Sequence, residues 1–191
     1  MQNEAFLVST SVVALAEMGD KTQLLSLILA ARYRKPIPIV LGILVATLLN
    51  HALAGALGAW LSSLMSPTTL NWVMAIAFIA MGLWILVPDK LDEDEVKVPK
   101  KQMGVFFATL VAFFLAEMGD KTQFATIALG AQYSDTFMVV LGTTFGMMLA
   151  NVPAVYLGNR FADRLPTRVV HMIAAAIFIV IGVLTLVKNL S

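Results

Sequence analysis

The sequence predicts an all-α integral membrane protein with six transmembrane helices, arranged as two three-helix repeats of inverted topology. Its composition, its apolar stretches and an internal repeat lead to this prediction. Hydrophobic residues make up 59% of the 191 residues and charged residues 13%, and the mean hydropathy is +0.85. A soluble domain carries about 25% charged residues. The net charge of +1 provides no basic surface for nucleic acid, and the lack of cysteine excludes disulfides and thiolate metal sites.

Six stretches are long and apolar enough to cross a bilayer, which takes about 20 mostly apolar residues. They cover residues 5–31, 37–61, 69–88, 103–131, 136–159 and 168–187. The N-terminus has no basic region or cleavage pattern of a signal peptide, so we expect the first stretch to stay in the membrane. The strongly hydrophilic segment DKLDEDEVKVPKK separates the third stretch from the fourth. We therefore expect a first repeat at 1–88, a cytoplasmic linker at 89–101 and a second repeat at 102–191.

The nonapeptide LAEMGDKTQ occurs at residues 15–23 and again at 115–123. The same offset of 100 also aligns Ala31 with Ala131, Tyr33 with Tyr133, Leu41-Gly42 with Leu141-Gly142, Leu57-Gly58 with Leu157-Gly158, and Gly82 with Gly182. Each repeat has three spans, an odd number, so the second repeat must enter the bilayer from the opposite side. Inverted repeats of this kind are typical of transporters, whose substrate site lies near the midplane between the repeats.

The basic residues predict the orientation in the membrane. Ten of the 13 Lys and Arg residues fall in the loops that share one face: Arg32, Arg34, Lys35, Lys90, Lys97, Lys100, Lys101, Arg160, Arg164 and Arg168. The opposite face has only Lys188, and the remaining two lysines belong to the repeated motif. The positive-inside rule then places both termini on the non-cytoplasmic side. We expect a multi-pass protein of the cell (inner) membrane.

The repeated motif places charges at membrane depth. On a continuous helix, Glu17, Asp20 and Lys21 would share one face. The second copy repeats the pattern with Glu117, Asp120 and Lys121. Glu17 and Lys21 could simply neutralise each other, but that would leave Asp20 and the duplication unexplained. A two-fold axis in the membrane plane would bring the two charged faces together.

Charge balance indicates what these acids bind. An ionised side chain at the bilayer centre costs about 2.5–3.5 kcal/mol on insertion scales. Four acids and two lysines leave a charge of −2, which one divalent cation or two protons would cancel. The same carboxylates cannot hold both well, because they repel one another when ionised and a bound metal displaces protons. The pattern therefore predicts cation–proton exchange, with Glu17, Asp20, Glu117 and Asp120 binding the cation.

Other residues of the motif have supporting roles. The amide oxygens of Gln23 and Gln123 join the carboxylates in an all-oxygen set that suits Ca²⁺, Mg²⁺ or Mn²⁺. Gly19 and Gly119 allow close helix approach or a local distortion of the helix. The remaining motif candidates are Lys21 and Lys121 as counter-ions, Thr22 and Thr122 as backbone bonders or site-lining groups, and Met18 and Met118 as soft ligands or packing groups.

Stripes of small residues mark the second and fifth spans. Every fourth position is small or polar in both, at 42–58 and 142–158. Such stripes let helices touch backbone to backbone, and we expect them to press against the motif-bearing helices. Asn50 and Asn151 lie within these spans and either bond a site carboxylate or link helices. His51 is either a packed neutral group, a ligand or a proton relay.

The two copies of EMGDKTQ resemble the E-x-G-D-[KR]-[TS] signature of a small membrane family of Mn²⁺/Ca²⁺ cation–proton antiporters. That family includes Golgi manganese/calcium transporters and bacterial manganese exporters. The resemblance covers the whole chain and implies that Glu17, Asp20, Glu117 and Asp120 are ligands. It implies transport of Mn²⁺, Ca²⁺ or both out of the cytosol against H⁺, and the duplicated single chain most resembles the bacterial manganese exporters. We therefore expect Mn²⁺ export with no cofactor, and no enzyme, because no nucleophile-and-base set is visible in the sequence. Alternatives are a Ca²⁺/H⁺ antiporter with the same site and a passive divalent cation channel. The expected partners are the cation, protons and the lipid bilayer.

Overall fold

The computed structural model describes residues 2–87, 104–157 and 167–190, and this part of the chain is all-helical, with no β-strand. The predicted linker at 89–101 lies outside the described residues. The eight helices are α1 (Gln2–Glu17), α2 (Lys21–Tyr33), α3 (Pro36–Ser63), α4 (Pro67–Ile85), α5 (Val105–Glu117), α6 (Lys121–Gln132), α7 (Thr136–Leu157) and α9 (Thr167–Leu190).

Four of these helices are long and apolar enough to cross a membrane, namely α3, α4, α7 and α9. They coincide with four of the six stretches predicted from hydropathy. The other two predicted stretches, 5–31 and 103–131, are each divided into two shorter helices. The division falls inside the repeated motif in both cases, between α1 and α2 and between α5 and α6. The motif therefore marks two helix breaks at matching positions.

Backbone-close packing holds α3 and α7 against the motif-bearing helices, as the small-residue stripes predicted. A Cβ built on Gly42 of α3 would lie 2.8 Å from the carbonyl oxygen of Phe106 in α5. The matching Gly142 of α7 would place a Cβ 2.6 Å from the carbonyl oxygen of Phe6 in α1. At Gly58 the clash would be closer still, 2.1 Å from the carbonyl oxygen of Ile127 in α6. Any side chain larger than hydrogen would push these helices apart.

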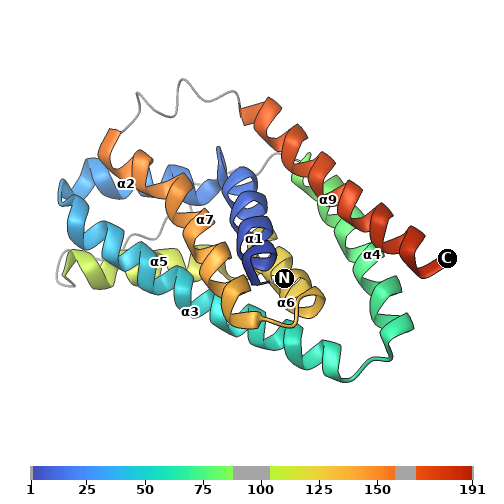
Figure 1. Cartoon of the computed structure of the whole chain (residues 1–191). Helices are drawn as coiled ribbons and strands as arrows, with labels where there is room; N and C mark the ends of the chain where they lie inside the picture. The colour runs from blue at the N-terminus through green and yellow to red at the C-terminus, as the bar shows by residue number, and fades with distance from the viewer. Residues whose placement is uncertain (1, 88–103, 158–166, 191) are drawn as a thin grey trace.

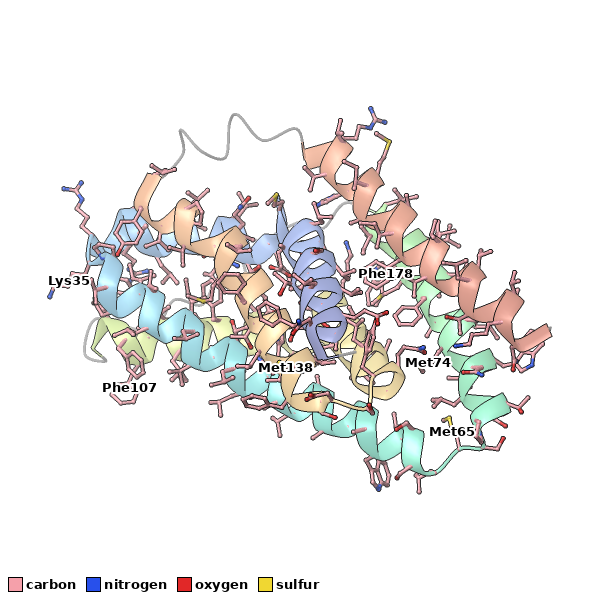
Figure 2. All side chains as sticks on the ribbon, in the orientation of Figure 1. Lys35, Met65, Met74, Phe107, Met138 and Phe178 are labelled. Carbon is pink, nitrogen blue, oxygen red and sulfur yellow. The ribbon has the colours of Figure 1, made fainter. Side chains whose placement is uncertain are left out.

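The third helix of each half, α4 and α9, forms a separate antiparallel pair beside the other helices (Figure 1). Gly82 of α4 approaches Ile179 of α9, and Gly182 of α9 approaches Ile79 of α4 in the same way. The rings of Phe78 and Phe178 meet between the two helices, with centroids 6.1 Å apart; Figure 2 labels Phe178 on α9. These matching contacts make the pair a compact unit with an approximate internal two-fold symmetry.

The α4–α9 pair packs mainly against one motif-bearing helix from each half. α4 lies along α6, and α9 lies along α1. The shared apolar core contains large side chains from the pair and mostly alanines from the two motif-bearing helices: Met74, Phe78, Met81, Ile85 and Phe178 on the one side, and Ala5, Ala16, Ala125, Ala128 and Ala131 on the other. The helices α2 and α5 lie on the opposite side of the helix breaks (Figure 1).

Candidate cation site

Both copies of the motif form a sharp break between two helices. Helix α1 ends at Glu17 and α2 begins at Lys21, while α5 ends at Glu117 and α6 begins at Lys121. The expectation that the motif residues share one face of a continuous helix was therefore wrong. The glycine inside each break explains why. Gly19 has φ 87° and Gly119 has φ 77°, a left-handed conformation that L side chains rarely adopt.

Hydrogen bonds within each motif hold the break in shape. The Gly19 amide donates to Oε1 of Gln23 at 2.9 Å, and the Gly119 amide donates to Oε1 of Gln123 at 2.8 Å. Each glutamine thus uses its amide oxygen to fix its own bend. Nε2 of Gln23 also donates to the carbonyl oxygen of Ala150 in α7. The glutamines therefore serve as braces of the bends in this structure.

The two aspartates cap the helices that follow the breaks. Oδ1 of Asp20 accepts a hydrogen bond from the Lys21 amide at 2.8 Å, and Oδ2 of Asp120 accepts one from the Thr122 amide at 3.4 Å. Aspartate is among the residues preferred at this position, since it satisfies a free N–H and complements the helix dipole. Each motif therefore presents a helix N-terminus with its aspartate beside the glutamate that ends the preceding helix.

The four motif acids gather in the interior, away from the surface of the protein. Glu17 and Glu117 are 0% exposed, and Asp20 and Asp120 are 3% exposed. Single carboxylate oxygens of Glu17, Asp20 and Asp120 all lie within 4.8 Å of one another. Glu117 interacts electrostatically with Glu17 and Asp120. The cluster thus combines acids from both halves of the chain, as the two-fold argument predicted.

Threonines satisfy one oxygen of each buried glutamate. Oγ1 of Thr22 donates to Oε2 of Glu17, and Oγ1 of Thr122 donates to Oε2 of Glu117 at 3.0 Å. The second oxygens, Oε1 of Glu17 and Oε1 of Glu117, are buried without a hydrogen-bond partner among the described residues. A buried carboxylate oxygen without a partner is costly. These two atoms are therefore positions where a cation or a proton would be stabilising.

The two motif lysines differ in their contacts. Nζ of Lys21 forms an ion pair with Oδ1 of Asp120 at 2.8 Å, which links the two halves of the chain. Nζ of Lys121 donates to the carbonyl oxygen of Val87, just after α4, at 2.8 Å. The ion pair with Asp120 is the contact that the predicted counter-ion role of Lys21 requires. The two copies of the motif are identical in sequence and unequal in their surroundings.

The polar residues of α3 and α7 link helices. Nδ2 of Asn50 donates to the carbonyl oxygen of Phe114 in α5 at 3.1 Å. Oδ1 of Asn151 accepts a hydrogen bond from Ser26 in α2 at 2.7 Å. His51 is fully buried, and neither of its ring nitrogens has a hydrogen-bond partner among the described residues. Met118 is 57% exposed, so its thioether does not contribute to the cluster.

One contact of the motif was not predicted from the sequence. Nε2 of His171, near the start of α9, lies 2.8 Å from the carbonyl oxygen of Met18 within the first bend. The offset of 100 pairs His171 with Asn71, so only a polar character at this position is shared between the halves. That signal is too weak to predict a contact with the motif.

The fold and the cluster define a class: a multi-pass membrane protein whose interior contains buried acids from both halves of the chain. Ionisable residues inside a membrane protein typically mark ion or proton pathways. The comparisons with known proteins are specific. The model of the GDT1 family, described as divalent cation/proton antiporters, matches residues 5–93 and 105–191. The chain belongs to this family, which is a family of transporters.

Individual relatives cover nearly the whole chain. A Vibrio cholerae protein described as a "Putative manganese exporter" is 51% identical over 179 residues, which is 93% of this chain and 88% of the relative. GDT1-like protein 5 of Arabidopsis thaliana is 30% identical, covering 96% of this chain and 95% of the relative. A GDT1-like protein of Synechocystis is 29% identical, covering 95% of this chain and 96% of the relative. No solved structure matches this chain.

Proposed function

We propose that this protein exports Mn²⁺ from the cytoplasm in exchange for H⁺, with the cation bound by Glu17, Asp20, Glu117 and Asp120. The observation that carries the proposal is the gathering of these acids, from both halves of the chain, in one buried cluster. The choice of Mn²⁺ is supported by the description of the Vibrio cholerae relative. Gln23 and Gln123 act on the site mainly by holding the bends that carry the acids.

The six-span inverted repeat is part of the same proposal. The pairs α1–α2 and α5–α6 each act as one interrupted span, which adds two spans to the four continuous ones. Interrupted helices whose ends meet near the midplane are a recurring way to build ion sites in transporters. The domains are then 1–88 and 102–191, joined by the linker at 89–101. The positive-inside rule, applied to the basic loops, supports a position of both termini on the non-cytoplasmic side of the cell membrane.

The exchange follows from the competition for the same oxygens. Mn²⁺ entering from the cytoplasm binds the ionised carboxylates and cancels their excess negative charge. On the other side, protons neutralise the same carboxylates, and the metal leaves. Neither the empty charged cluster nor a cluster with both metal and protons is favourable in the interior of the protein. Transport of one species is therefore coupled to the return of the other.

Ca²⁺ is the second candidate substrate. The side-chain oxygens of the cluster come from carboxylates and hydroxyls, and Ca²⁺ binds such oxygen sets readily. The thioether of Met118, a softer donor that would favour Mn²⁺ over Ca²⁺, is exposed and lies outside the cluster. Parallel assays with the two ions decide between them.

The test uses the purified protein in liposomes with an internal metal-sensitive dye and a pH indicator. We expect Mn²⁺ uptake to move protons in the opposite direction. Asp20→Asn and Glu117→Gln should each abolish both signals, while Glu4→Gln, at an exposed acid in α1, should leave them unchanged. Full-rate exchange by either site variant would refute the assigned site. Metal flux without proton movement would indicate a channel instead.

A further inference from the structure

The α4–α9 pair contacts the two halves of the site unequally. At the end of the pair that lies beside the helix breaks, the Trp84 ring of α4 meets the Phe124 ring of α6, with centroids 5.6 Å apart. At the same end of the pair, His171 of α9 contacts the Met18 carbonyl oxygen, and the Val87 carbonyl oxygen accepts a hydrogen bond from Lys121. These contacts attach the pair to α1 and α6.

The repeat relates each of these contacts to a second set of residues that are apart here. The offset of 100 pairs Trp84 and Phe124 with Leu184 of α9 and Leu24 of α2, two helices without a substantial interface in the described part of the chain. It pairs His171 and Met18 with Asn71 and Met118, and Met118 is 57% exposed. At the level of helices, the equivalents of the α4–α6 and α9–α1 interfaces would be α9–α2 and α4–α5. Neither is a substantial interface in the described part of the chain.

We propose that the α4–α9 pair is the moving gate of this transporter, sealing one half of the membrane at a time. In the structure the pair packs on α1 and α6; in the alternative state it packs on α2 and α5, using the equivalent residues. The inference rests on the proposed function, since it requires the inverted repeat. Inverted repeats allow the second state to be built by exchanging the conformations of the two halves.

The packing within the α4–α9 pair suits an element that moves as a rigid body. Within the pair, Gly82 and Gly182 bring the two backbones into close contact, and Phe78 meets Phe178. Towards the bundle, the apolar core shared with α1 and α6 includes five alanines of these helices beside Val12 and Leu129. An element that is tightly packed within itself can move as a rigid body between two states.

The orientation follows from the charge asymmetry of the loops. Helix α1 starts at the N-terminus and α6 ends at Gln132, and both of these ends belong to the face predicted to be non-cytoplasmic. In this structure the pair therefore covers the non-cytoplasmic half, while the four acids are at most 3% exposed. His171 positions the gate by holding the first bend to α9.

The chain has no cysteine, so paired cysteines can test the gate directly. One double variant is Trp84→Cys/Phe124→Cys, for the observed state, and the matched one is Leu24→Cys/Leu184→Cys, for the other state. A short, reducible bifunctional thiol reagent is applied to the protein in liposomes, because a direct disulfide forms only where the two Cα atoms lie within about 7 Å. We expect both pairs to cross-link and each cross-link to stop exchange, which reduction restores.

The control is Phe78→Cys/Phe178→Cys, within the moving unit. Its cross-link should leave exchange intact, because the two helices move together. A Leu24/Leu184 pair that never cross-links, with or without Mn²⁺ and a pH gradient, would overturn the gate, as would full exchange by the cross-linked Trp84/Phe124 pair. Cross-linking is scored on gels independently of transport. Cross-linking of both pairs in a protein whose cysteine-free parent exchanges no cation would therefore refute the proposed function alone.

A second set of variants guards against loss of folding in the cysteine pairs. His171→Gln keeps a side-chain amide that can donate to the Met18 carbonyl oxygen, whereas His171→Ala removes the contact. In the Trp84→Cys/Phe124→Cys background, we expect His171→Ala to lower the yield of the cross-link and His171→Gln to preserve it. Equal yields in the two variants would contradict the positioning role of His171.

Discussion

At the residue scale, the two identical motifs place identical side chains in different surroundings. Lys21 forms an ion pair with Asp120 of the other half, whereas Lys121 donates to the backbone of Val87. An ammonium group beside a cluster of carboxylates offsets part of their charge when no metal is bound. When a cation binds, the same ammonium repels it. At the proposed cation site, Lys21 would therefore weaken the hold on the cation and favour its release.

Removing this charge should tighten metal binding. We expect Lys21→Gln to lower the Kd for Mn²⁺ about tenfold, or about 1.4 kcal/mol, since nearby charges at an intermediate dielectric interact by a few kcal/mol. Exchange should become slower because release is harder. Calorimetric titration of the purified protein with Mn²⁺ measures the change. Lys35→Gln, at an exposed lysine just before α3, is the control, and an unchanged or raised Kd for Lys21→Gln would contradict this role.

At the element scale, the helix break is the feature that the sequence indicated least clearly. Hydropathy alone predicts one continuous span through each motif, and a wheel drawn on that span puts the acids on one face. The acids do meet, but because a glycine with positive φ ends one helix and an aspartate caps the next. Glycine is also compatible with a regular α-helix, so the sequence allowed either a continuous helix or a helix break. Only the backbone conformation decides between them.

Two glycines in the second half separate the effect of backbone conformation from that of space. A Cβ at Gly119 or at Gly104 would meet nothing within 4 Å, but only Gly119 has a left-handed φ. We expect Gly119→Ala to lower the free energy of unfolding by about 1–2 kcal/mol and to reduce exchange, because alanine resists this conformation. Gly104→Ala should be neutral. Thermal unfolding in detergent measures the stability of both variants. Equal midpoints for the two variants would show that alanine at position 119 does not strain the bend.

At the scale of the whole molecule, much of the architecture was predictable from repetition and composition. The apolar stretches predicted the four continuous helices. The small residues of α3 predicted the close contact of α3 with the motif-bearing helices. The repeat also led us to expect that acids of both halves meet, and Glu17, Asp20 and Asp120 lie close together. The unequal placement of the α4–α9 pair was not predictable, because a sequence repeat specifies what the two halves share. Differences between the halves depend on which of two similar packings the molecule adopts.

The proposed orientation can be checked with single cysteines in the naturally cysteine-free chain. Asn3→Cys reports on the N-terminal end of α1, and Lys35→Cys reports on the connection between α2 and α3; both positions are exposed. In intact cells, a membrane-impermeant thiol reagent should label position 3, whereas position 35 should react only after the cells are opened. The reverse pattern would place the termini in the cytoplasm and would reverse the side of the membrane that the pair covers.

The glutamine braces have a consequence for selectivity. Because Oε1 of Gln23 and Oε1 of Gln123 are bonded to glycine amides, each bend is a closed ring that resists deformation. If the bends stay intact during transport, the proposed change of accessibility comes from helices that move past them. The two states of the proposed gate are related by the repeat, so an ion arriving from either compartment would meet equivalent donors. The protein should therefore discriminate between metals equally well in forward and in reverse operation.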